Sequence, residues 1–155
     1  MLQLKRSKGG AYELSDKKQA IELIGKTVKV GEETVESPGE YEQGGLEIVY
    51  ATNAALLVWD HMQICYLFSL AAPDDFEKNQ LSSADIILLS DEIETCSKEQ
   101  LTGLIGAYDP RSVIISGKTN LDAGYRDIIK PIEQTTIKLA ANLLPVEGRD
   151  FYILP

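Results

Sequence analysis

The chain of 155 residues carries a formal net charge of -9, and 44% of its residues are hydrophobic. This length suits one domain with a substantial core, so we expect residues 1–155 to form a single domain. The acidic balance argues against a nucleic-acid partner, because it repels phosphate backbones. No apolar run approaches about 18 residues, and the polar, basic start differs from a secretory signal, so we expect no membrane association and a cytoplasmic location.

The charge is spread unevenly along the chain. Residues 1–30 hold seven Lys or Arg against three Asp or Glu, whereas residues 31–100 hold two against fifteen. The basic first part and the acidic middle can therefore attract each other, within one chain or between two copies. The alternative is that both are solvated faces that keep the protein in solution.

Short runs that alternate apolar and polar residues fill the first 35 positions. A period of two is typical of strands that bury one face. This part of the chain therefore predicts an antiparallel sheet that is solvated on its other face. The predicted strands contain Leu2 and Leu4, Tyr12 and Leu14, Ile21 and Leu23, Val28 and Val30, and Thr34 and Val35.

Residues 37–45 are interpreted as a turn region between two strands. Pro38–Gly39 suits a type II turn, because proline fixes φ and glycine adopts the positive φ that the turn requires. Gly44–Gly45 allows a second tight bend. Alternation over residues 46–50 then predicts a strand, and residues 56–67 predict a β-hairpin that turns at Asp60–His61.

Helices enter the pattern in the second half of the chain. Residues 73–81 predict a short helix, and the capping-box pattern Ser97-Lys98-Glu99-Gln100 opens a helix over 98–108. Apolar strands at 84–89 and 113–115 flank the second helix, which predicts a right-handed βαβ unit. We also expect a short helix within 120–130 and strands over 135–139 and 151–154.

Two Gly-Lys-Thr triplets resemble the end of a phosphate-binding loop. The full motif needs a glycine five positions before the glycine of the triplet. Ala20 stands there for the triplet at Gly25, and Ser112 for the triplet at Gly117. Neither triplet therefore predicts a nucleotide site.

The remaining reactive residue types also have ordinary interpretations. His61 is the only histidine, and we expect it to be a turn residue, because histidine tolerates the left-handed region of φ/ψ space. Cys65 and Cys96 have no C-x-x-C spacing, and we expect both to be reduced packing residues. The carboxylates at 91, 92 and 94 follow a buried strand, where they form either an ordinary acidic loop or a site for a hard cation.

The string Ser37-Pro38-Gly39-Glu40-Tyr41-Glu42-x-Gly44-Gly45, followed by a strand, resembles one in metallo-β-lactamase-fold hydrolases. The most similar group is the zinc-dependent hydrolases that are similar to ascorbate-phosphate lactonase. The resemblance continues through the hairpin at 60–67, the helix near 98–108, the strand at 110–115 and the closing strand at 151–155. It implies an α/β fold, a shortened αββα sandwich in which helices flank two packed β-sheets.

The departures from this family bear on function. The family binds two metals through an H-x-H-x-D-H loop, a bridging Asp and further His residues, and the loop is missing between roughly Ile21 and Thr34. Ser69 stands where the resemblance places the bridging Asp, and Ala72 and Ser116 stand where it places His residues. Neutral hydroxyls do not replace imidazole and carboxylate ligands. The resemblance therefore implies no cofactor, no metal ligands and no catalytic residues, with the hydrolase activity lost.

We expect a non-catalytic protein whose vacated region is an interaction surface for a second copy or another protein, because loss of the metal loop exposes apolar sheet surface or an edge. The alternative is a small-molecule binder or altered hydrolase that uses the old cleft without a dinuclear metal site. The rim of that cleft would be Ser69, Asp91 and Ser116. A third interpretation is one subunit of a split enzyme, whose metal loop comes from another chain.

Overall fold

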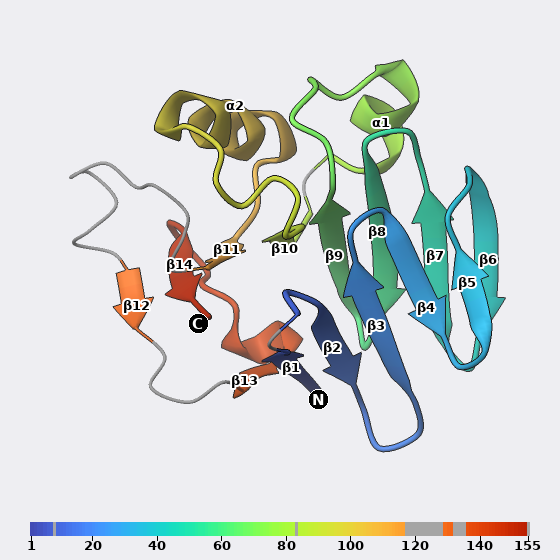
Figure 1. Ribbon diagram of the computed structural model, residues 1–155. Helices are drawn as coiled ribbons and strands as arrows, with labels where there is room; N and C mark the ends of the chain where they lie inside the picture. The colour runs from blue at the N-terminus through green and yellow to red at the C-terminus, as the bar shows by residue number, and fades with distance from the viewer. Residues whose placement is uncertain (8, 83, 117–128, 132–135, 155) are drawn as a thin grey trace.

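The computed structural model describes residues 1–155 apart from 8, 83, 117–128, 132–135 and 155. The described residues form two β-sheets that pack face to face around a shared core (Figure 1). The strands of the first sheet are β1 (Leu2–Arg6), β2 (Tyr12–Ser15), β3 (Ala20–Ile24), β4 (Thr27–Val30), β5 (Glu33–Val35) and β13 (Thr136–Leu139). Those of the second are β6 (Gly39–Gln43), β7 (Leu46–Tyr50), β8 (Ala54–Trp59), β9 (Met62–Leu67), β10 (Ile86–Leu89), β11 (Ser112–Ile115), β12 (Ile129–Pro131) and β14 (Asp150–Ile153).

The six-stranded sheet has the order β13-β1-β2-β3-β4-β5 and is antiparallel throughout. Its strands alternate buried and exposed side chains, as Leu2 and Leu4 of β1 illustrate, both fully buried. Strand β13 comes from the far end of the chain and pairs with β1, with Leu139 opposite Leu2. The predicted meander with one solvated face is confirmed.

The outer face of this sheet is polar. Lys5 lies opposite Glu13 across the β1–β2 pair, and Lys29 lies opposite Glu22 across the β3–β4 pair. All four side chains are exposed. Ile24 of β3 is the one exposed large hydrophobic side chain on strands β1 to β5, so this face is not the apolar sheet surface that we predicted as an alternative to an exposed edge.

The eight-stranded sheet has the order β12-β14-β11-β10-β9-β8-β7-β6 and combines two kinds of pairing. Strands β6 to β9 are antiparallel neighbours, whereas β9, β10, β11, β14 and β12 run parallel. Helix α2 (Lys98–Tyr108) connects β10 with β11 after the predicted capping box at Ser97 and Gln100. The predicted βαβ unit is thus confirmed.

A second apolar core lies between the eight-stranded sheet and the helices. Leu101 and Leu104 of α2, with Leu81 at the end of α1 (Asp75–Gln80), pack there against the strands. Cys65 and Cys96 belong to the same core as free, buried thiols. The predicted two-sheet sandwich of the α/β class is confirmed, and its two described α-helices pack on the eight-stranded sheet. Neither is long and apolar enough to cross a membrane.

The segment that we interpreted as two turns contains an edge strand instead. Gly39 has φ of 158°, a positive value that favours glycine, as predicted, but one far from the roughly 80° of a type II turn. The predicted type II turn at Pro38–Gly39 is therefore wrong, and β6 begins at Gly39. The second bend is confirmed: Gly44 and Gly45 have φ of 58° and 83°. Positive φ at both positions is the requirement of a type I′ hairpin turn.

The sequence also predicts a hairpin turn at Asp60–His61 and a short helix within 120–130. The hairpin turn at Asp60–His61 is confirmed, with positive φ at both residues. The short helix predicted within 120–130 falls largely outside the described residues, and strand β12 begins at Ile129.

A buried carboxylate fastens α1 to the β7–β8 turn. Glu77 is fully buried, and its oxygens accept from the backbone N–H of Asn53 at 2.8 Å and from Asn53 Nδ2 at 2.7 Å. It also accepts from the N–H of Asp74, the N-cap of α1, at 3.0 Å. Three donors around one carboxylate compensate its removal from water.

We expect Glu77→Ala to lower the free energy of unfolding by about 2–3 kcal/mol, because it leaves buried donors of Asn53 unpaired. Chemical denaturation followed by circular dichroism measures this loss. Glu99→Ala, at an exposed position in the first turn of α2, is the matched control and should change it by less than about 0.5 kcal/mol. Equal losses in the two variants would contradict the anchoring role.

Candidate functional site

The carboxyl ends of parallel strands β9, β10 and β11 meet at one end of the sandwich. Ser69, Asp91 and Ser116, the residues predicted for a cleft rim, follow these three strands. Ser69 and Asp91 are partly exposed, whereas Ser116 is 5% exposed. Ser69 Oγ accepts from the N–H of Ala71 at 3.1 Å, so it shapes its own loop.

A tight turn of the six-stranded sheet lies against the end of β10. Between β3 and β4, the N–H of Gly25 donates to Asp91 Oδ1 at 3.1 Å. The carbonyl of Gly25 accepts from Tyr66 Oη at 2.8 Å and from Ser90 Oγ at 3.0 Å. Glycine suits this position, because its φ is 56°. Three side chains of the eight-stranded sheet thus bind one turn of the other sheet.

The turn between β1 and β2 comes equally close to Asp91. A Cβ atom on Gly10 would lie 2.9 Å from the Cβ of Asp91, a distance that forces something to shift. Asp91 therefore lies between two glycine turns. This packing restricts the space beside the carboxylate, which stays partly exposed.

Arg6, the last residue of β1, and Glu94, in the segment after β10, form a buried ion pair. Their side chains are 6% and 5% exposed, and the guanidinium of Arg6 lies 5.0 Å from the ring centre of Tyr12. Tyr12 Oη donates to the carbonyl of Leu89 at 2.8 Å, at the end of β10. Among the described residues, Nη1 of Arg6 has no hydrogen-bond partner. Opposite charge and the ring face offset the cost of burying the arginine.

Burial also keeps the tyrosines of this network neutral. It raises the pKa of Tyr12 to about 12, with the nearby Arg6 lowering it and Glu94 raising it by smaller amounts. Burial likewise raises the pKa of Tyr66 far above its ordinary value. Both hydroxyls donate hydrogen bonds, and burial keeps them protonated to a higher pH than an exposed tyrosine.

The residues at the strand ends do not fit a dinuclear metal centre. Ser69 and Ser116 offer neutral hydroxyls, and Asp91 already accepts the N–H of Gly25. No group of three or more His, Cys, Asp or Glu in the described part of the chain could hold a metal ion. His61 lies in the β8–β9 turn, at the opposite end of β9 from Ser69.

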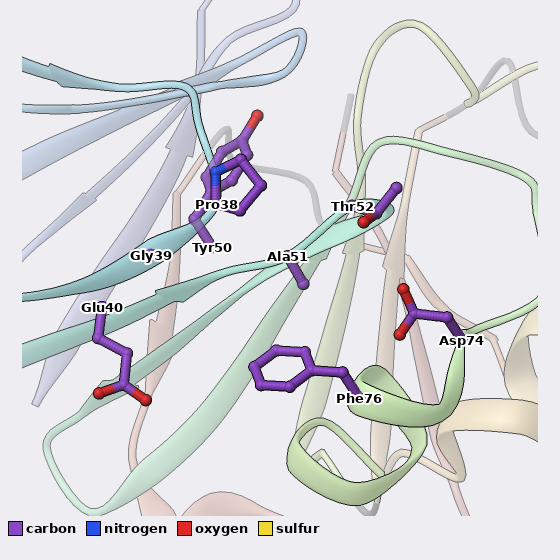
Figure 2. A pocket seen from close by; sticks show the side chains of 8 residues that line it. All are labelled: Pro38, Gly39, Glu40, Tyr50, Ala51, Thr52, Asp74 and Phe76. Carbon is purple, nitrogen blue, oxygen red and sulfur yellow. The ribbon is translucent and has the colours of Figure 1, made fainter.

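A different concavity lies on the outer face of β6, β7 and β8, beside α1. It consists of a hollow of about 600 Å³ and a second of about 410 Å³, and Glu40 lines both. We call it the acidic groove and define it by Glu40, Glu42, Glu47, Val49, Leu56 and Val58. Figure 2 shows the smaller hollow, with Phe76 of α1 extending toward Ala51 and Glu40 on the far side.

Sequence reasoning missed the acidic groove, because β6 was interpreted as a turn. One signal pointed to it: no Lys or Arg occurs from residue 30 to residue 77. That span covers the edge strands of both sheets at this end, β5 and β6. Neither hollow is lined by Lys, Arg or His among the described residues.

Comparison with known proteins supports the fold. No protein-family model and no curated protein matches the chain. A solved structure from Thermotoga maritima, of a protein proposed to be a Zn-dependent hydrolase of the metallo-β-lactamase superfamily, matches with a TM-score of 0.71. The match has 9% sequence identity and covers 99% of this chain and 98% of that one. At this identity the likeness establishes the fold alone.

Removing one partner of the Arg6–Glu94 pair should destabilise the protein. We expect Glu94→Ala to lower the free energy of unfolding by about 3–5 kcal/mol, because the guanidinium stays buried without its counter-charge. The double variant Arg6→Met/Glu94→Leu should lose clearly less. Urea denaturation of the three proteins compares them, and a double variant less stable than Glu94→Ala would contradict a buried-charge cost.

The buried tyrosines should make the protein sensitive to alkaline pH. The pKa of Tyr12 is raised from 10.0 to about 12, so the folded state binds more protons than the unfolded state between these values. This contribution is complete below pH of about 10 and is lost as pH rises toward about 12. Tyr12→Phe should make the decline shallower in denaturation curves recorded across that range, and an unchanged slope would contradict the assignment.

Proposed function

The chain has the metallo-β-lactamase fold, and we propose that it serves as a non-catalytic module that binds protein partners. The packing at the strand ends is the observation that supports a non-catalytic role. There Gly25 and Gly10 lie against Asp91, and the Arg6–Glu94 pair is buried below. A reaction centre needs room for substrate and a group placed to react with it. Here the one carboxylate of the predicted rim is used to bind a turn.

The edge of the eight-stranded sheet supports the proposal that the chain binds protein partners. β6 is an edge strand, and four of its five residues are exposed. An exposed edge offers unpaired N–H and C=O groups to another chain. The acidic groove lies directly beside this edge, so backbone pairing and side-chain contact are available together. The partner is either a second copy or another protein.

The use of the predicted rim as a small-molecule site remains an alternative. Ser69, Asp91 and Ser116 do follow neighbouring strands, which is where α/β folds place ligands. Thermal-shift measurements against phosphosugars, nucleotides and divalent metals test this alternative directly. A rise in Tm of several degrees with one ligand class would favour a binder over an interaction module.

Position-specific crosslinking tests the proposed interaction in the native host. We expect a photo-crosslinking amino acid at Tyr41, on edge strand β6, to capture a protein partner. The same amino acid at Glu22, exposed on the outer face of the six-stranded sheet, is the matched control. Adducts at neither position, or equal adducts at both, would contradict an interaction through this edge.

We expect the purified native protein to contain zinc and iron well below one atom per chain. The neutral hydroxyls of Ser69 and Ser116 bind neither metal tightly. Elemental analysis by mass spectrometry measures this. A stoichiometric, dialysis-resistant metal would refute the non-catalytic assignment and favour a centre completed by another chain.

A further inference from the structure

The acidic groove combines an apolar floor with a rim of one charge sign. Val49 and Val58 are half-buried and Leu56 is 4% exposed, so the floor is partly open to water. Glu40, Glu42 and Glu47 are all exposed around it. The groove therefore offers apolar contact and negative charge on the same surface.

The pairing register brings these carboxylates together. Glu42 lies directly opposite Glu47 across the β6–β7 pair, and Glu40 lies two residues from Glu42 on the same face. Like charges that face each other across two strands destabilise a sheet. The carboxylates therefore repel each other, and a bound cation would reduce this repulsion. No lysine or arginine lines the groove in the described part of the chain.

The open backbone of β6 is aligned with these side chains. The two-residue turn at Gly44–Gly45 makes Gln43 and Leu46 a hydrogen-bonded pair. Because pairing alternates along an antiparallel ladder, the N–H and C=O groups of Glu40 and Glu42 point away from β7. No described strand pairs with that side of β6.

Charge decides which occupant suits this edge. A second copy that paired antiparallel through β6 would set Glu40 and Glu42 against the same two residues, which opposes such a dimer. A segment with Lys or Arg at every second position would instead direct its cations toward the three carboxylates. Its remaining side chains would point to the other face of the sheet, the face of Tyr41.

We propose that a cationic, extended segment of another protein adds to β6 as a further antiparallel strand. Its alternate Lys or Arg side chains lie over Glu40, Glu42 and Glu47 of the acidic groove. This inference rests on the proposed interaction function and names the chemistry of its partner. A segment of about five residues spans the edge, because β6 has five.

The test measures binding of a fluorescein-labelled heptapeptide of alternating lysine and valine by fluorescence anisotropy. We expect saturable binding that weakens as salt rises. The triple variant Glu40→Gln/Glu42→Gln/Glu47→Gln should weaken it about tenfold. The control Glu22→Gln, on the outer face of the other sheet, should bind like the natural chain. Equal affinity of the triple variant and the natural chain would overturn the charge recognition.

Backbone pairing is tested separately from charge. Glu42→Pro removes the outward N–H and the charge, whereas Glu42→Gln removes only the charge, so the proline variant should bind far more weakly. If the proline variant does not fold, methylated peptides test backbone pairing independently. In antiparallel addition, methylating the lysine amides should abolish binding, and methylating the valine amides should not. Equal binding of both methylated peptides would overturn strand addition.

The outcomes separate this inference from the function on which it rests. A partner crosslinked at Tyr41 that lacks any Lys- or Arg-rich segment would overturn the cationic occupant and leave the interaction function standing. A dimer in light scattering that Glu42→Pro disrupts would overturn it in favour of a second copy. Peptide binding without any crosslinked partner in the host would leave the groove chemistry standing and count against the proposed function.

Discussion

The contact on which the rest of the strand-end region depends is that between Asp91 and the Gly25 turn. Asp91 follows the buried parallel strand β10. Its Oδ1 accepts the N–H of Gly25, and Ser90 and Tyr66 donate to the carbonyl of the same residue. Both sheets are therefore joined at the end where α/β proteins commonly keep their reactive groups. Deeper in the sandwich, the Arg6–Glu94 pair and Tyr12 continue this junction.

That junction lies at the carboxyl ends of the central strands β9 and β10, whereas the acidic groove lies on the outer face of the same sheet along its edge strand β6. The junction binds a backbone N–H with Asp91 and buries the Arg6–Glu94 ion pair, so the two sheets are held in a defined arrangement. The groove leaves three carboxylates exposed and without described cations. Glu77 links the groove to the body of the protein, because it holds α1, the wall that carries Phe76, against the β7–β8 turn.

Local patterns predicted most strands and both α-helices of the described residues. The meander from β1 to β5 was predictable because each strand pairs with its sequence neighbour and alternation fixes its buried face. Helix α2 was predictable from Ser97 and Gln100, which satisfy each other's backbone. Strand β6 was missed because its side chains are exposed on both faces and because it starts with a glycine directly after a proline. The closure at Asp91 was also missed, because Gly25 lies 66 residues away and no local pattern reports such a contact.

The pairing of β1 with β13 has a consequence for synthesis of the chain. Leu2 and Leu139 face each other, so β1 is synthesised long before the strand that pairs with its outer side. The meander can form early, because its contacts are local, while the parallel strands and β13 must follow. Until then β1 is a temporary edge with two apolar side chains, Leu2 and Leu4. Slow synthesis of the segment that contains β13 therefore lengthens the time for which this apolar edge can pair with another chain.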